Sequence, residues 1–348
     1  MRVICVMRVV CVLCCLVVGA GAVAQQPGGD ATALPVLHLS TQLVVLDAIV
    51  AEKKTGRMET TLTANDFVLE EDGVPQKIRD FSQDKLPLSI VLMFDLTESV
   101  QPQLKDLAAG AQRVLAHLKP EDEVAVMTFS SATQLLQPFT TDHKAVAAAI
   151  AKAAASSTKE GTFLDESVYE GAAEAMRSTI PGSRRVLLFF TDGTENEVHG
   201  LAVKLYGKQA PATLHSGAEA KEELLQTGVT VSALIDRTAT DDAEIAASMV
   251  NPLSFAFGIS ARMDHVARLA TDTGGPVLHG NGKQVADKMG TLIEEIRGRY
   301  TMGYVPTTSH PAGTLCHISL KLSVEAYAQH PELKQGHYVV ETRTAYYR

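Results

Sequence analysis

Strand-like and helix-like segments alternate through the middle of the chain, and this alternation constrains the fold most strongly. The segments LSIVLMFD (88–95), DEVAVMTFS (122–130) and RRVLLFFT (184–191) are continuous apolar runs, typical of parallel strands that are buried on both faces. Between them, segments such as 101–119 and 142–156 show a helical period. The sequence therefore predicts an α/β fold with a doubly wound, mostly parallel sheet flanked by helices.

The segments on either side of this region are typical of antiparallel β-structure. FVLEEDGVPQKIRDF (67–81) predicts a hairpin that turns at Asp72 and Gly73. HISLKLSV (317–324) alternates strictly, with one apolar face made of Ile318, Leu320, Leu322 and Val324. Neither flank has enough strands to be stable alone, so we expect the two to meet in a small β-sandwich.

Polar residues follow two of the predicted parallel strands. Asp95 ends the first strand, and Thr97 and Ser99 follow it at alternate positions; Asp192 comes directly after the strand 184–191, and Thr162 precedes a predicted helix. Ser, Thr and Asp also favour helix N-caps, which is the alternative interpretation. Ligands of doubly wound sheets bind at the carboxyl ends of the strands. Two carboxylates at one such edge repel each other unless a positive charge lies between them.

Two carboxylates and three hydroxyls suit a hard divalent cation. Mg²⁺ takes about six oxygen ligands and keeps several waters. No His or Cys joins the set, so zinc is disfavoured here. The sequence predicts a site for Mg²⁺, or for Mn²⁺ or Ca²⁺, with the ligands Asp95, Thr97, Ser99, Thr162 and Asp192.

The motifs DLTES, GT and FTDG, in this order, resemble the metal-ion-dependent adhesion site (MIDAS) of the von Willebrand factor type A (VWA) domain. The resemblance implies that the hydroxyls of Thr97, Ser99 and Thr162 contact the metal, and that both Asp residues do so directly or through water. It also implies that a partner carboxylate completes the coordination. Thr97 stands where the family motif has Ser, which keeps the hydroxyl. Glu98 stands where many members have a small residue, and it adds negative charge near the mouth of the site.

The first 24 residues resemble a secretory signal peptide. Arg2 and Arg8 precede a short apolar run, and small residues end the segment at Ala22-Val23-Ala24. Four of the five cysteines lie in this segment, so the exported chain keeps only Cys316, which we expect to be a buried strand residue. The net charge of −9 argues against nucleic acid or an anionic membrane as the main partner.

The flanks extend the resemblance to the VWFA-related Acidobacterial domain family, whose members are exported bacterial proteins of this layout. The expected domains are a signal peptide (1–24), a linker (25–37), an N-terminal β segment (38–86), a VWA domain (87–302) and a C-terminal β segment (303–348) that pairs with the first. Two insertions, at 194–222 and 237–261, follow strands and are expected to be either partner-specific surfaces or surface loops.

We expect an exported, periplasmic or secreted, binding module that uses its metal to hold an acidic group of a protein or polymer. One alternative is an assembly protein whose metal only stabilises loops. A metal-assisted hydrolase is the other, but no Ser-His-Asp order, H-E-x-x-H or G-x-S-x-G motif is present. Glu98 and Asp165 are the only candidate bases near the site, and Asp165 is better explained as a helix N-cap, so we expect no enzymatic activity.

Overall fold

The computed structural model describes most of the chain beyond the predicted signal peptide and linker. Both of these segments lie outside the described residues. Residues 41–348 form one compact unit. The described ranges are 43–54, 56–83, 86–98, 100–101, 104–158, 162–192, 214–236, 265–280, 292–333 and 336–348.

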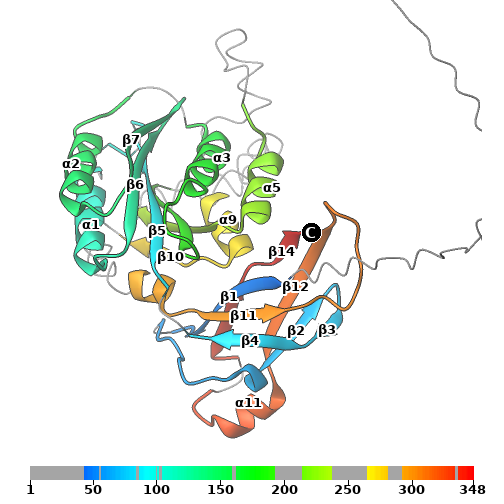
Figure 1. Cartoon of the computed structure of the whole chain (residues 1–348). Helices are drawn as coiled ribbons and strands as arrows, with labels where there is room; N and C mark the ends of the chain where they lie inside the picture. The colour runs from blue at the N-terminus through cyan, green and yellow to red at the C-terminus, as the bar shows by residue number, and fades with distance from the viewer. Residues whose placement is uncertain are drawn as a thin grey trace, which may run out of the picture. The chain divides into compact units, whose positions relative to one another are not determined.

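A six-stranded sheet forms the centre of the α/β part (Figure 1). Its strands, in spatial order, are β10 (Val277–Gly280), β9 (Thr230–Asp236), β8 (Arg184–Thr191), β5 (Leu88–Asp95), β6 (Glu123–Phe129) and β7 (Thr133–Thr140). The first five are parallel, and β7 pairs antiparallel with β6 at one edge. This arrangement confirms the predicted doubly wound, mostly parallel sheet.

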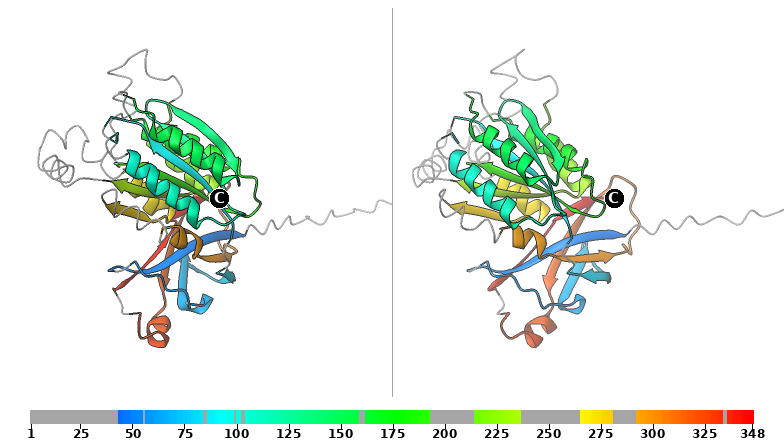
Figure 2. Two further views of the ribbon diagram at one scale, coloured as in Figure 1. Left: turned by 90° about the vertical axis from the view of Figure 1, so that its left-hand side faces the viewer. Right: turned by 60° about the vertical axis from the view of Figure 1, so that its left-hand side comes forward.

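Helices cover both faces of this sheet (Figure 2). Alternate residues of β5 point to opposite faces, as strand geometry requires: Leu92 belongs to one apolar core and Met93 to the other. The first core contains α1 (Leu104–His117), α2 (His143–Ala154) and the helical residues 292–297; the second contains α3 (Leu164–Ala175), α5 (Gly217–Thr227) and α9 (His265–Thr273).

Two antiparallel four-stranded sheets contain strands from both flanks. One has the order β13 (Tyr338–Thr342), β1 (Val44–Glu52), β11 (Tyr300–Tyr304), β4 (Ile78–Ser82); the other has the order β14 (Ala345–Tyr347), β12 (Leu315–Leu322), β2 (Phe67–Glu71), β3 (Val74–Gln76). They share one apolar core, which includes Leu46, Leu69 and Tyr300, so we call them the sandwich. The predicted domain boundaries stay predictions, and β11 runs across the one at 302.

The predicted hairpin turn is present between β2 and β3. Asp72 has φ 49° and Gly73 has φ 79°, the left-handed pair that a tight two-residue hairpin turn needs. The same segment then crosses to the other sheet, because β4 pairs with β11.

The prediction that Val324 belongs to the apolar strand face is wrong. Val324 is 80% exposed. It is the first residue of the short helix α11 (Val324–Gln329). Ser323 ends the strand because its hydroxyl accepts a hydrogen bond from the Ala326 N–H at 3.0 Å, as a helix N-cap does.

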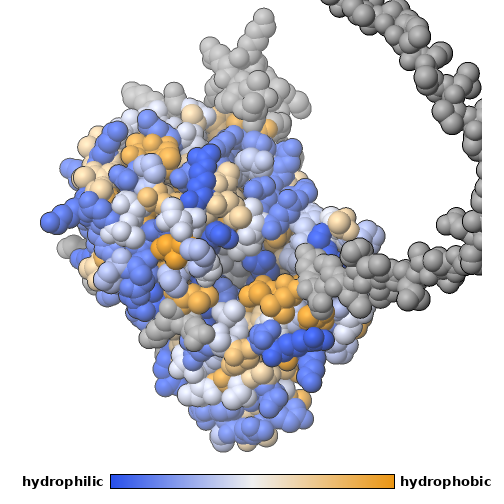
Figure 3. All heavy atoms as spheres, viewed as in Figure 1, coloured by the Kyte–Doolittle hydropathy of each residue, from blue (hydrophilic) through white to orange (hydrophobic). Residues whose placement is uncertain are grey.

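The surface of the described residues is mixed in polarity. Figure 3 shows apolar residues in separate patches on a largely hydrophilic face. The most exposed large apolar side chains belong to different elements, among them Val45 of β1, Leu135 of β7 and Val324 of α11. Within the described ranges, no helix has both the length and the apolar character needed to cross a bilayer.

Candidate metal centre

The central strands bring Asp95 and Asp192 to the same edge of the sheet. In the parallel pair β5–β8, Phe94 lies beside Phe190, and their rings stack with centroids 4.7 Å apart. Asp95 is the last residue of β5, and Asp192 directly follows the last residue of β8. Because the strands are parallel and in register, both carboxylates lie at the carboxyl edge, where doubly wound sheets bind ligands.

Backbone hydrogen bonds join the neighbouring loops to this edge. The Leu96 N–H donates to the Phe129 carbonyl at 3.0 Å, and the Phe163 N–H donates to the Ser130 carbonyl at 2.9 Å. The second bond fixes the loop that carries Thr162 against the end of β6. Thr162 is thereby held at the rim on which Asp95 also lies.

Hydroxyl donors surround the Asp95 carboxylate. Its Oδ1 accepts hydrogen bonds from the backbone N–H of Thr97 at 3.0 Å and from the Thr97 hydroxyl at 2.6 Å. Its Oδ2 accepts a hydrogen bond from the Thr191 hydroxyl at 2.8 Å. The Thr97 proton is used on Asp95, so the oxygen lone pairs are the part of this hydroxyl that can face a cation.

The two carboxylates are buried together. Asp95 is fully buried, and the side chain of Asp192 is 8% exposed. The pKa of Asp95 is raised to about 6, first by burial and then by the nearby charge of Asp192. The hydrogen bonds from Thr97 and Thr191 act in the opposite direction. A buried carboxylate whose pKa is raised by burial and by a second carboxylate nearby is the electrostatic signature of a site that accepts positive charge.

One polar atom at this edge has no partner within the part of the chain that the structure describes. The Thr162 Oγ1 is buried and makes no hydrogen bond to these residues, although buried hydroxyls nearly always have a partner. A buried hydroxyl without a partner and two buried carboxylates form an oxygen-only donor set. These residues therefore fit a hard divalent cation such as Mg²⁺.

Four of the five predicted ligands are described, and the structure places all four at this edge: Asp95, Thr97, Thr162 and Asp192. Ser99 lies outside the described residues. Glu98 is exposed, in agreement with its expected position at the mouth of the site. Binding of a metal by these residues stays a prediction.

One residue that contacts the site was not identified from the sequence. Thr191, which holds Asp95, is the second residue of the FTDG motif, so its position beside Asp192 was the available signal. Asp165 was predicted to be a helix N-cap, and this is wrong: Phe163 occupies that position in α3. Asp165 instead forms an ion pair with His265, at 2.8 Å between Oδ1 and Nε2.

The first predicted insertion is partly regular structure. Residues 214–222 belong to the described fold and lead into α5, where Ser216 and Glu219 form a capping box. His215 contacts Glu166 at 2.9 Å and stacks on Tyr169. The rest of this insertion and the whole of 237–261 lie outside the described residues.

Comparisons with known proteins agree with this fold. Residues 90–195 match the sequence profile of the von Willebrand factor type A domain. No curated protein matches the chain. The more specific resemblance to VWFA-related Acidobacterial proteins stays a prediction.

Solved structures with similarity include BatB from Bacteroides thetaiotaomicron, at 17% identity and a TM-score of 0.38 over 60% of this chain and 98% of that one. A von Willebrand factor type A protein from Catenulispora acidiphila has 10% identity and a TM-score of 0.42 over 82% of this chain and 75% of that one. Proximal thread matrix protein 1 from the mussel byssus, with a zinc-occupied MIDAS motif, has 13% identity and a TM-score of 0.39 over 65% and 49%. Similarity at this level carries no functional argument. The profile match and the order of the parallel strands show that the chain contains a von Willebrand factor type A domain.

Proposed function

We propose that this protein is an exported binding module that holds a divalent cation at the carboxyl edge of its central sheet, with Mg²⁺ as the first candidate ion. A domain of this type supports a metal-dependent adhesion or interaction role. The proposed ligands are Asp95, Thr97, Ser99, Thr162 and Asp192, and the proposed partner is a protein or polymer that offers a carboxylate.

The observation that carries the proposal is the burial of Asp95 beside Asp192. A buried carboxylate is unfavourable unless it is paired, and the pKa of Asp95 rises to about 6 because of burial and of Asp192. A cation between the two carboxylates would remove both effects. The Thr162 hydroxyl, which has no hydrogen-bond partner, would gain one ligand contact from the same ion.

The partner is inferred from the coordination number of the ion. Mg²⁺ takes about six ligands in near-octahedral geometry, and the five proposed side chains supply at most five if each binds through one oxygen. An open position accepts an oxygen ligand from outside, and a carboxylate oxygen is such a ligand. Glu98, exposed near the mouth, would oppose an acidic partner and so favour one whose carboxylate reaches the ion directly.

Export is proposed from the sequence of residues 1–24. The absence of a membrane-crossing helix within the described ranges is compatible with it. The proposal includes no catalysis, because the sequence has no Ser-His-Asp order, H-E-x-x-H or G-x-S-x-G motif.

The first test is a calorimetric titration of Mg²⁺ and Mn²⁺ into the chain from Gln25 onward, in the native form and as Asp192→Asn. We expect one saturable site in the native protein and its loss in the variant. Glu170→Gln, which changes an exposed carboxylate of α3, is the matched control and should bind as the native protein does. Equal binding in native protein and Asp192→Asn would refute the metal site.

The second test addresses the partner. Immobilised poly-glutamate should retain the protein in Mg²⁺ and release it in chelator, and poly-glutamine should retain it in neither. If immobilised poly-glutamate retains the protein equally in Mg²⁺ and in chelator, the result favours the alternative in which the metal only stabilises loops.

A further inference from the structure

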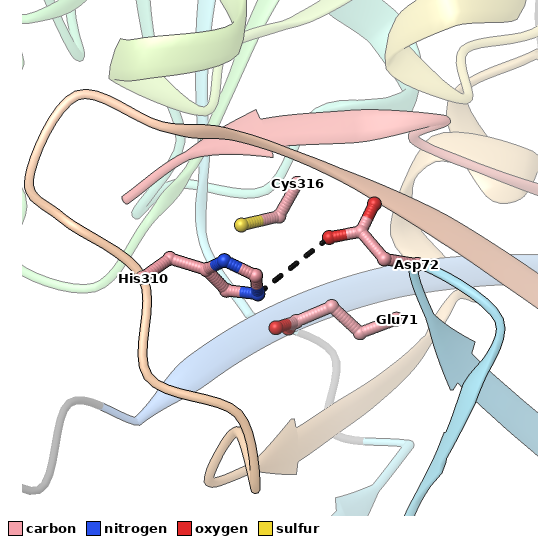
Figure 4. Close-up of side chains that lie close together, drawn as sticks. All are labelled: Glu71, Asp72, His310 and Cys316. Carbon is pink, nitrogen blue, oxygen red and sulfur yellow. Dashed lines mark ion pairs between the residues drawn. The ribbon is translucent and has the colours of Figure 1, made fainter.

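A second group of metal-ligand side chains lies in the sandwich, away from the VWA motif in sequence. It consists of Glu71, Asp72, His310 and Cys316, each of which offers one ligand atom, and these atoms all lie within 4.8 Å of one another. Figure 4 shows the four side chains pointing into a common space. We call this group the sandwich cluster.

The fold brings the cluster together from three segments. Glu71 ends β2, and Asp72 begins the turn to β3 with φ 49°. Cys316 is the second residue of β12, where the next-but-one residue, Ile318, pairs with Glu71. Cys316 and Glu71 are therefore diagonal neighbours on one face of the sheet. His310 comes from the connection between β11 and β12.

Glu71 is a buried carboxylate with neutral partners. It is fully buried, and its Oε2 accepts hydrogen bonds from the Tyr304 hydroxyl at 2.5 Å and the Tyr346 hydroxyl at 3.0 Å. Among the ion pairs of the described residues, none includes Glu71. A buried carboxylate that has several donors but no positive partner points to a cation that belongs beside it.

The other carboxylate is oriented in the same way. Asp72 Oδ1 accepts a hydrogen bond from the His317 backbone N–H at 3.0 Å, and the ring Nδ1 of His317 lies 3.3 Å away. Its Oδ2 lies 3.8 Å from Nε2 of His310. The cluster thus has an outer layer of Tyr and His groups that fix its carboxylates, as the outer groups of metal sites do.

The Cys316 thiol completes the group. It is fully buried, and it donates a long hydrogen bond, 3.8 Å from Sγ to the Thr314 carbonyl oxygen. Zinc binds cysteine as the thiolate, so a metal that binds here displaces the thiol proton.

We propose that the sandwich cluster binds Zn²⁺ through Cys316, His310, Asp72 and Glu71. Thiolate and imidazole select zinc over Mg²⁺ or Ca²⁺, and four protein ligands suit the closed tetrahedral geometry of a structural zinc site. Zinc bonds of about 2.0–2.3 Å require ligand atoms that are closer together than 4.8 Å. His310, on a connecting segment and 28% exposed in its side chain, is the residue that moves inward.

The bound ion would join the turn after β2, the connection before β12 and β12 itself. Its role is to fix the edge of the sandwich, and it does not depend on the VWA site. The two sites differ in chemistry, since the VWA donors are all oxygen and the sandwich cluster contains sulfur.

This difference gives a direct test with Co²⁺ as a spectroscopic substitute for zinc. Cys316 is the only cysteine after residue 24, so a thiolate-to-cobalt charge-transfer band in the chain from Gln25 onward can come only from this cluster. We expect the band to saturate at one equivalent, to persist in Asp192→Asn, and to disappear when Zn²⁺ is added.

Variants separate ligand roles from folding. The band should be absent in Cys316→Ser. Affinity should fall at least about tenfold in His310→Ala, and about 10-fold to 100-fold in Tyr346→Phe, which removes a donor to Glu71. His337→Ala, at an exposed histidine outside the cluster, is the control and should leave the affinity unchanged.

If Cys316→Ser fails to fold, His310→Ala on the exposed connection still decides the question. A native chain that shows no charge-transfer band, or a His310→Ala variant with native affinity, would overturn the proposal. Neither result would bear on the Mg²⁺ site, because the titration of Asp192→Asn tests that site separately.

Discussion

Arg184 of β8 in the central sheet forms an ion pair with Asp47 of β1 in the sandwich. The Arg184 Nε lies 3.2 Å from Asp47 Oδ2, and the Arg184 side chain is only 4% exposed. Its Nη atoms also donate to the carbonyls of Arg297 at 2.5 Å and Arg299 at 3.1 Å. A single side chain thus connects the central sheet, the first strand of the sandwich and the segment that leads into β11.

This connection predicts a large effect of Arg184→Met. The change keeps the apolar stem but removes the Arg184 donor from Asp47 Oδ2 and from the carbonyls of Arg297 and Arg299, so we expect the free energy of unfolding to fall by about 3–5 kcal/mol. Urea denaturation measures this change. Arg79→Met, at an exposed arginine of β4, is the control and should change the free energy by less than about 0.5 kcal/mol. A small effect of Arg184→Met would show that the central sheet and the sandwich do not depend on this contact.

Glu295 predicts a pH dependence of stability. Burial raises its pKa to about 7, and the Glu341 carboxylate contributes in the same direction, against the charge of Arg299. Because the folded state holds this proton more tightly than the unfolded state, the free energy of unfolding should fall as pH rises from about 4.5 to about 7. Glu295→Gln should remove this part of the decrease and stabilise the fold by about 1–3 kcal/mol at pH 8.

Denaturation midpoints measured across this pH range test the prediction. Glu294→Gln, at the exposed neighbour in the chain, is the control and should follow the native curve. If Glu295→Gln also follows the native curve, the Glu295 carboxyl does not titrate with a raised pKa.

Two glycines predict opposite tolerance to alanine. A Cβ on Gly275 would lie 1.7 Å from the Val231 carbonyl oxygen of β9, so Gly275→Ala must push α9 and β9 apart. We expect a loss of about 3 kcal/mol or more. Gly182 has φ +72° and open space around its Cβ position, so Gly182→Ala should cost only about 1 kcal/mol of backbone strain. Thermal unfolding of the two variants makes the comparison, and equal losses would contradict it.

Much of the fold could be predicted because it depends on local patterns. Continuous apolar runs identified strands such as β5 and β8, and Asp72-Gly73 identified the hairpin turn. The candidate site followed from the same logic, since Asp95 and Asp192 end parallel strands and the fold sends both ends to one edge.

The rest depends on long-range contacts that no local pattern encodes. The crossing of β4 to the other sheet is decided by pairing with β11, which is more than 200 residues away in sequence. The sandwich cluster combines Glu71 with Cys316 by strand register. Arg184 begins a strand, and its partners lie on segments that only the folded chain brings together.

Thr162 offers the most direct test of the metal site, because its buried hydroxyl has no hydrogen-bond partner among the described residues. Thr162→Val keeps the shape and removes only this oxygen. Without metal, we expect the variant to be as stable as the native protein, or up to about 1 kcal/mol more stable. In a calorimetric titration with Mg²⁺, we expect its affinity to fall at least about tenfold relative to the native protein. Equal Mg²⁺ affinity in the two proteins would contradict the assignment of this edge as the metal centre.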